Sequence, residues 1–120
     1  LCPRGYATWS PRFFDAAATG CIPGIIADGI EMPFEQLLDY RSFSLKLLET
    51  EIGQLRQLLD AVPQTARARK RSALAIAAKA FAYPRGVDDP SVAGDALYFT
   101  FRMLETRKLK HMPLAGDRYV

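Results

Sequence analysis

The first third of the chain alternates polar loops with short apolar runs, and this pattern predicts a helix followed by a buried strand. A helix is predicted over residues 11–19, because Ser10 is a favoured N-cap and Pro11 suits the first helical position. Gly20 fits the left-handed residue that ends such a helix. The uninterrupted apolar run over residues 21–27 is typical of a strand that is buried on both faces in a parallel sheet.

Shorter signals mark the ends of this strand and its neighbours. Pro23 lacks an N–H donor, so we expect it at the start of the strand or at a bulge. Asp28-Gly29 ends the strand, and a short helical turn is expected over residues 34–38. Cys2-Pro3 is typical of the end of an earlier strand that runs into a loop.

The remaining part of the chain is predicted to hold one more strand and three helices. The predicted ranges are 43–48 for the strand and 51–61, 64–83 and 96–109 for the helices. Thr50 and Asp95 are suited to cap the first and the last of these helices. Apolar residues would share one face in each of three elements: Phe43, Leu45 and Leu47; Ile52, Leu55, Leu59 and Val62; and Leu97, Phe101 and Leu104. Phe99, Phe101 and Met103 are expected in the core.

The order of these elements predicts an α/β fold built on parallel strands. Two full strands make a thin sheet, so we expect further strands before Leu1. The 120 residues are 49% hydrophobic and 24% charged, as in ordinary globular domains. The chain does not begin with Met, and we expect it to be a piece of a longer protein. No window approaches the roughly 18 uninterrupted apolar residues that a membrane span needs.

Charge and cysteine usage narrow the function classes. Residues 1–62 hold five Lys or Arg against eight Asp or Glu, a net charge of −3, and residues 63–120 hold eleven against five, a net charge of +6. The basic cluster consists of Arg67, Arg69, Lys70 and Arg71. We expect it to be a solvated helix face, with an acidic glycan or lipid headgroups as the alternative partner. Nucleic acid is not expected, because no aromatic residues or groove-fitting motif accompany the cluster. Cys2 and Cys21 form no disulfide framework or zinc motif, and we expect both to be buried, although their spacing leaves a bridge open.

Polar residues gather where the predicted strands end and the first helix begins. In open parallel sheets, ligands bind beyond the carboxyl ends of the strands, next to helix N-termini. An arginine at such a place, here Arg12, suits a diphosphate. Asp15, one turn further on, can accept hydrogen bonds from ribose hydroxyls, or it can form a surface ion pair with Arg12 instead. The chain has neither G-x-G-x-x-G nor a P-loop motif.

Uncommon sequence elements follow one another in the first half of the chain, with CPRG at residues 2–5 and WSPRFFDAAATGCIPGIIADGIEMPF at residues 9–34. This run closely resembles the exostosin-like glycosyltransferases, a family that includes heparan sulfate polymerases and plant cell-wall transferases. The resemblance extends to about residue 62. It implies that residues 1–109 form most of the C-terminal, donor-binding lobe of a two-lobed GT-B enzyme, with a Rossmann-like parallel sheet, and that residues 110–120 are a tail.

The resemblance also implies the chemistry. The family transfers sugars from UDP-sugars to polysaccharide or glycoprotein glycan acceptors, with inversion and without an obligatory metal, so no cofactor is expected. Arg12 would bind the diphosphate and Asp15 the ribose, and Glu31 would touch the donor sugar or hold its loop. The full UDP-sugar site would consist of Arg4, Gly5, Ser10, Arg12, Asp15 and Glu31.

Several expectations concern partners outside this chain. No residue here is a convincing catalytic base, so the base is expected from the N-terminal lobe of the same protein, and the chain alone is expected to be inactive. The resemblance implies the lumenal side of the Golgi membrane, with any anchor outside this chain. Trp9 could stack on uracil or a sugar or anchor the helix entry, and His111 is not expected to be a ligand or catalyst. Two alternatives stay open: a catalytically silent lobe that acts in complex assembly, and a basic module that binds an anionic polymer.

Overall fold

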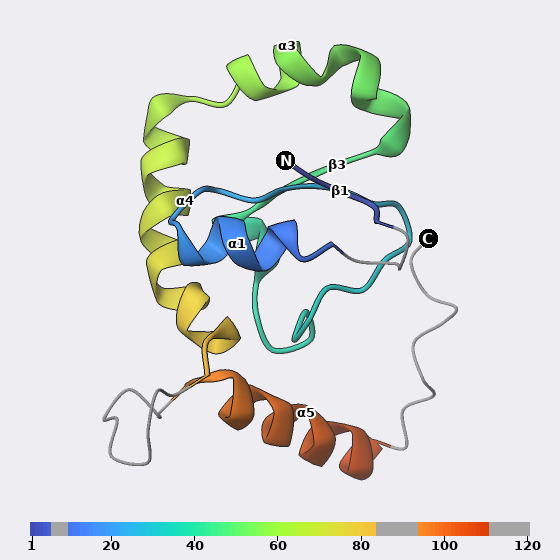
Figure 1. Ribbon diagram of the computed structural model, residues 1–120, viewed down its shortest axis with the longest axis vertical. Coiled ribbons are helices and arrows are strands. Elements are labelled where there is room, and N and C mark those ends of the chain that lie inside the picture. Colours follow the sequence, from blue (N-terminus) through green and yellow to red (C-terminus); the bar gives the residue numbers. More distant parts are fainter. Residues whose placement is uncertain (6–9, 84–93, 111–120) are drawn as a thin grey trace.

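The computed structural model describes residues 1–5, 10–83 and 94–110 (Figure 1). The interpretations of Trp9 and His111 and of the 110–120 tail beyond Lys110 therefore lie outside the described residues. Within them the chain is an α/β structure, in which a small sheet lies among helices (Figure 1). The predicted fold class is confirmed at this level.

The sheet has three parallel strands in the order β1-β2-β3. These are β1 (Cys2–Pro3), β2 (Gly24–Ile26) and β3 (Leu45–Leu47). In the register, Ile25 lies between Cys2 on one side and Lys46 on the other. The prediction that Cys2-Pro3 is the end of an earlier strand is confirmed, because these two residues pair with the central strand and add a third strand to the two predicted in full. As predicted for a proline, Pro23 lies just before the first paired residue.

Helix α1 (Arg12–Ala18) follows the first strand as predicted. Its backbone turns at Ser10, whose carbonyl oxygen accepts a hydrogen bond from the N–H of Phe13 at 3.1 Å. It ends before Gly20, which has a positive φ of 73° that costs glycine little. The helix runs back against the direction of the strands, so its amino end lies on the side of their carboxyl ends (Figure 1).

The segment before β3 corrects the prediction of a strand over residues 43–48. Residues 40–43 form a short helix, α2 (Tyr40–Phe43), because the carboxylate of Asp39 accepts a hydrogen bond from the N–H of Arg41 at 3.1 Å. Phe43 is consequently buried by helical rather than strand geometry, with its ring 4.8 Å from that of Tyr40 between centroids. Residues 34–38 form turns, and Phe34 has a positive φ of 59°.

The predicted helix over residues 51–61 is also different in the structure. A 3₁₀ helix, η1 (Glu49–Gln54), leads into α3 (Leu55–Asp60). Thr50 is not the cap, because the carboxylate of Glu51 accepts a hydrogen bond from the N–H of Leu48 at 2.8 Å and starts the turn two residues earlier. Ile52 is exposed, so the predicted apolar stripe is not continuous.

The second half of the described chain is helical. It consists of α4 (Gln64–Ala77), η2 (Ala78–Phe81) and α5 (Ala96–Lys110). Asp95 caps α5 as predicted, accepting a hydrogen bond from the N–H of Tyr98 at 2.8 Å. Leu97, Phe101 and Leu104 are exposed, and Phe101 has 63% of its surface accessible, so its predicted place in the core is wrong. Helix α5 contacts the rest of the fold through the buried Ala96 and through Phe99, whose ring lies 5.6 Å from that of Phe34 between centroids.

The core lies between the sheet and the helices α1, α2 and α4. Its largest side chains form a group of packed rings around Phe13, which contacts Tyr40 and Phe81 at centroid distances of 5.6 and 5.0 Å. Leu74 of α4 is fully buried against this group. Burial raises the pKa of the Tyr40 hydroxyl, which donates a hydrogen bond to the Pro33 carbonyl at 2.7 Å and thereby holds the loop after β2 to the core.

The two cysteines differ from each other. Cys2 is buried as expected, and burial raises the pKa of its thiol. Cys21 is exposed, which corrects the expectation that both would be buried, because the run from Cys21 enters the sheet only at Gly24. Both thiols are free, so no bridge joins them.

Candidate functional site

The carboxyl ends of the three strands are tied together by charged residues that follow them. The N–H of Arg4, just after β1, donates a hydrogen bond to the carbonyl of Ile26 in β2 at 2.9 Å. Its guanidinium lies 3.7 Å from the carboxylate of Glu49, which follows β3. We call this edge, formed by Arg4, Asp28 and Glu49, the strand-end rim.

Asp28, which follows β2, and Glu49, which follows β3, form hydrogen bonds with each other. The N–H of Asp28 donates to Glu49 Oε1 at 3.2 Å, and the N–H of Glu49 donates to the Asp28 carboxylate at 3.3 Å from each oxygen. The sequence interpretation included Arg4 in the site and gave Asp28 only as the end of its strand, and it missed Glu49. A signal was present, because each carboxylate stands two residues after the last residue of its strand. The prediction that β3 continued to Leu48 concealed it.

The amino end of α1 contributes the second group of predicted residues. Ser10 is buried, and its hydroxyl oxygen accepts a long hydrogen bond of 3.4 Å from the N–H of Arg12. Gly5 is half-buried at the end of the first described segment, directly after Arg4. Arg4 and Gly5 directly follow β1, and Ser10 and Arg12 lie at the amino end of α1, which Figure 1 shows on the side of the sheet on which the strands end.

Arg12 and Asp15 are both exposed on α1. Four ion pairs are formed among the described residues, and none of them joins Arg12 to Asp15. The structure therefore does not show the alternative of a surface ion pair between Arg12 and Asp15. Burial raises the pKa of the Cys2 thiol, the positive charges of the N-terminus and of Arg12 lower it, and the negative charge of Asp15 raises it. An exposed guanidinium and carboxylate one turn apart can bind one ligand from the same side.

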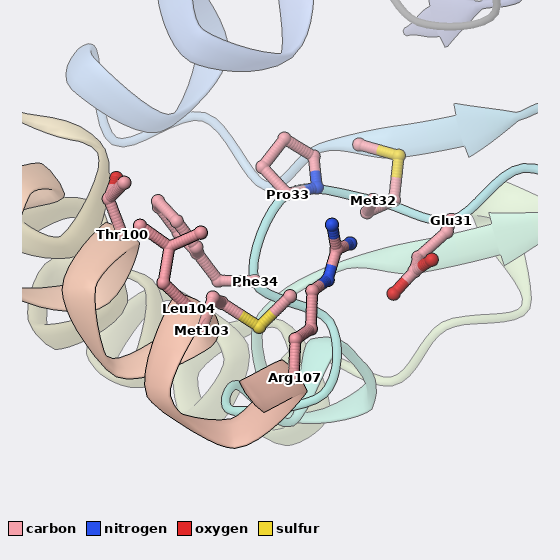
Figure 2. Close-up of a pocket in the computed structure, with 8 residues that line it drawn as sticks. All are labelled: Glu31, Met32, Pro33, Phe34, Thr100, Met103, Leu104 and Arg107. Carbon is pink, nitrogen blue, oxygen red and sulfur yellow. The ribbon is translucent and has the colours of Figure 1, made fainter. Parts of the chain in front are cut away.

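Glu31 lies apart from this group. Its carboxylate accepts a hydrogen bond from the side-chain amide of Gln36 at 3.0 Å. It stands at the mouth of a pocket of about 360 Å³ between the loop after β2 and helix α5 (Figure 2). Among the described residues no ion pair or hydrogen bond links Glu31 to Arg4, Arg12 or Asp15.

The basic cluster has structural partners. Lys70 donates hydrogen bonds to the carbonyls of Arg41 and Ser44, the latter at 2.9 Å, and so fixes the end of α2 against α4. Arg67 donates to the carbonyl of Val62 at 2.9 Å and so closes the end of α3. Arg69 and Arg71 are exposed. The expectation of a solvated helix face holds for these two and must be corrected for Lys70, which is partly buried.

Among the residues that the structure describes, no three His, Cys, Asp or Glu side chains gather closely enough to hold a metal ion. No described helix combines the length and the apolar character needed to cross a membrane.

Comparison with known proteins places this geometry in a family. A family model described as the Exostosin GT47 domain matches residues 1–62, which include the strand-end rim and α1. The "Probable glucuronosyltransferase Os01g0926700" of Oryza sativa subsp. japonica is 36% identical over 113 residues, which are 92% of this chain and 26% of that protein. The "Probable beta-1,4-xylosyltransferase IRX10" of Arabidopsis thaliana is 35% identical over 113 residues, with the same coverage of 92% and 26%.

A third relative matches the first half more strongly. The "Probable glucuronoxylan glucuronosyltransferase IRX7" of Arabidopsis thaliana is 45% identical over 65 residues, which are 54% of this chain and 14% of that protein. The chain spans about a quarter or less of the length of these curated relatives. Since the family model matches more than half of the chain, and these relatives are named as glycosyltransferases, the chain belongs to the exostosin GT47 family.

Proposed function

We propose that this chain is the donor-binding part of a glycosyltransferase and that it binds a UDP-sugar beyond the strand ends. The observation that carries the proposal is that the residues matched by the family model are also those that form the strand ends and the start of α1. The family model matches residues 1–62, and within this range Arg4 directly follows β1, while Ser10, Arg12 and Asp15 belong to the first turns around the start of α1. Because parallel α/β sheets bind ligands beyond their strand ends and next to helix N-termini, this arrangement supports the proposal. A Rossmann-like lobe of a two-lobed GT-B protein fits the small parallel sheet.

The proposed chemistry rests on two guanidinium groups. Arg12 is exposed and makes none of the four described ion pairs, so its planar fork is available for a pyrophosphate. Arg4 is half-exposed, and its one ion pair with a described residue is the 3.7 Å contact with Glu49, a weak surface contact that a phosphate can replace. Together they would stabilise the negative charge that develops on the departing UDP. Gly5 would let the backbone approach the phosphates closely, and Ser10 would orient the first turn of α1.

The remaining donor contacts and the reaction partners follow from this placement. Asp15 would accept hydrogen bonds from the ribose hydroxyls, and Glu31 would face the sugar. Transfer with inversion needs a base that deprotonates the acceptor hydroxyl. We propose that the base and most of the glycan acceptor site belong to an N-terminal lobe of the longer protein. Transfer would need no metal or other cofactor, because Arg4 and Arg12 would supply the positive charge. Action at the lumenal side of the Golgi membrane is part of the same proposal.

The alternative of a basic module that binds an anionic polymer is not favoured. Two of the four cations in the basic cluster, Arg67 and Lys70, donate to backbone carbonyls and hold helix ends. Recruiting them to a polymer would leave those carbonyls without these donors.

UDP binding by the 120-residue chain tests the proposal. A ligand at 100 times its Kd should stabilise the fold by ~2.7 kcal/mol, which is seen as a rise of the melting temperature. Arg12→Ala should remove this effect, whereas Arg56→Ala should keep it, because Arg56 has a 96% exposed side chain on α3 and pairs only with Asp60. Protection that persists unchanged in Arg12→Ala would contradict the proposed site. Turnover of the full-length protein then separates an active transferase from a silent lobe.

A further inference from the structure

A cavity opens between strand β3, the loop after β2 and the helices α2 and α4. Its volume of about 460 Å³ falls within the range of small-molecule sites, roughly 300–1,000 Å³. None of the residues assigned to the UDP-sugar site belongs to its lining. Its charged residues are Glu35, Arg41, Lys46 and Lys70. We call this cavity the α2–α4 pocket, and it is separate from the strand-end rim.

The charged side chains of the α2–α4 pocket do not neutralise one another. Three cations and one carboxylate give the lining a formal charge of +2. Glu35 Oε1 lies 3.6 Å from the ammonium of Lys46, and Glu35 Oε2 accepts a hydrogen bond from the N–H of Met32 at 2.7 Å. Neither Arg41 nor Lys70 takes part in an ion pair among the described residues. The pocket therefore has an excess of positive charge that an anion can balance.

The ammonium group of Lys70 is already fixed in place. It donates hydrogen bonds to the carbonyls of Arg41 and Ser44, the latter at 2.9 Å. An ammonium has three N–H donors, so one is left for a ligand while the two bonds that hold α2 against α4 are kept. Because the side chain is ordered before a ligand arrives, its binding loses little rotamer entropy.

Arg41 brings a guanidinium to the same place. Its N–H donates to the Asp39 carboxylate at 3.1 Å, and its carbonyl accepts from Lys70, so its backbone is held at both ends. The residue is exposed, and its guanidinium makes no hydrogen bond or ion pair with a described residue. A planar fork on a fixed backbone can bind an oxyanion through two parallel hydrogen bonds next to the Lys70 ammonium.

The uncharged polar groups of the lining have no proton to give to a ligand. The hydroxyl of Ser44 donates to the Tyr40 carbonyl at 2.7 Å, and the hydroxyl of Tyr40 donates to the Pro33 carbonyl at 2.7 Å. Both side chains are buried, so breaking either bond is costly. The rest of the lining is apolar and consists of Ile25, Met32 and Leu45. The free donors are therefore those of the cations, which bind a charged acceptor more strongly than a neutral one.

These features fit a dianion on a small carbon skeleton. A phosphate monoester carries about two negative charges above pH ~6, which matches the formal charge of the lining, whereas a carboxylate or a sulfate monoester carries one. A bare phosphate ion is about the size of a few water molecules at roughly 30 Å³ each, so it would leave room for carbon atoms. We infer that the α2–α4 pocket binds a phosphate monoester. Its oxygens accept hydrogen bonds from Lys70 and Arg41, and its carbon skeleton lies against Ile25 and Met32.

Chemical-shift titration of the 120-residue chain with methyl phosphate and methyl sulfate tests this inference. The two probes have nearly the same shape and differ in charge. Methyl phosphate at about pH 7.5 should bind about tenfold more tightly than methyl sulfate, a difference equivalent to ~1.4 kcal/mol. The largest shifts should be those of the backbone N–H groups of residues 40–46 and of the turn around Lys70.

Variants then assign the binding to the pocket. Arg41→Gln should keep the fold and weaken methyl phosphate about tenfold, because it removes a guanidinium without a described partner. Arg71→Gln removes the same charge from an exposed residue beside Lys70 in sequence but outside the pocket, and it should leave the affinity nearly unchanged. Lys70→Gln should abolish binding. Its urea unfolding is measured in parallel, and Arg41→Gln decides should Lys70→Gln not fold.

The phosphate monoester could belong to a soluble compound or to the headgroup of a phospholipid. Co-sedimentation separates these sources, with vesicles of phosphatidylcholine alone and with a nine-to-one mixture of phosphatidylcholine and phosphatidic acid, whose headgroup is a phosphate monoester. Binding to the mixed vesicles that is lost in Arg41→Gln would assign the lipid. Binding of methyl phosphate without binding to either vesicle would assign a soluble ligand.

Three outcomes overturn the inference. They are equal affinities for methyl phosphate and methyl sulfate, an unchanged affinity for methyl phosphate in Arg41→Gln, and shifts confined to α1 and the strand-end rim. The proposed UDP site is tested apart from this pocket. Arg41→Gln should keep the rise of the melting temperature with UDP, and Arg12→Ala should still bind methyl phosphate at residues 40–46. Each of the two proposals can therefore fail while the other holds.

Discussion

Replacing Glu49 by Gln should change stability and ligand affinity in opposite directions. Glu49 accepts a hydrogen bond from the N–H of Asp28 at 3.2 Å and lies 3.7 Å from the Arg4 guanidinium, with 37% of its side chain exposed. Glutamine keeps an oxygen that can accept from Asp28 but loses the charge. The ion pair is a surface contact, worth ~0.2–1 kcal/mol, and the remaining hydrogen bond becomes weaker without its charge. We therefore expect a loss of about 1 kcal/mol in the free energy of unfolding.

The effect on UDP should be a gain. A phosphate hydrogen-bonded to the far side of the Arg4 guanidinium, which is itself 3.7 Å from the Glu49 carboxylate, would lie on the order of 8 Å from that carboxylate. Two like charges at that distance repel by ~0.5 kcal/mol in water and by ~2 kcal/mol at the effective dielectric constant near a protein surface. Since Glu49 is partly exposed, we take the lower part of this range, which corresponds to about two- to fivefold tighter binding of UDP by Glu49→Gln.

Urea unfolding and calorimetric titration with UDP measure the two effects, with Glu105→Gln as the matched control. Glu105 also loses an ion pair, with Arg102 at 3.0 Å, but lies on α5 outside the rim. The gain in affinity should shrink as salt is raised, because the repulsion is screened. If Glu49→Gln bound UDP with unchanged or lower affinity at low salt, Arg4 would not be a phosphate ligand.

Two further predictions concern the core and the cysteines. Leu74→Ala should lower the free energy of unfolding by ~2–5 kcal/mol, because Leu74 is fully buried. Leu104→Ala, at a residue that is 55% exposed, should cost much less. Urea unfolding compares the two variants, and equal losses would contradict the described core. Iodoacetamide at about pH 8 should modify Cys21 rapidly and Cys2 slowly, since Cys2 is buried and its raised pKa lowers the fraction of reactive thiolate at that pH. Mass spectrometry of the labelled peptides follows both sites. Equally fast labelling would show that the Cys2 side chain of β1 is not buried in solution.

Local sequence signals predicted those elements that local chemistry determines. Gly20 follows the end of α1 and Asp95 starts α5, because caps and left-handed residues act within one turn of the chain. The N-cap of α1 was predicted one residue too early, since Pro11 and not Ser10 takes that position. Phe43 was wrongly assigned to a strand, because a local cap signal nearby was not taken into account. Its apolar alternation with Leu45 and Leu47 resembles a strand, and the cap at Asp39 that makes it helical was overlooked.

The candidate site was predictable only in part. Arg4, Arg12 and Asp15 follow from the position of one strand and one helix close together in sequence. Glu49 depends on the end of β3, and element ends are poorly determined by propensity alone. Glu31 and Arg107 line one pocket although 76 positions of the chain separate them, and no periodicity in either segment indicates this. Long-range packing had to be seen before this pocket could be described.

The position of UDP in a crystal of this chain tests the central claim most directly. The account predicts that the pyrophosphate lies within hydrogen-bonding distance of the Arg12 guanidinium, beyond the carboxyl ends of β1 and β2, with a ribose hydroxyl facing Asp15. Density for UDP at any other surface, with the Arg12 side chain directed into solvent, would contradict it.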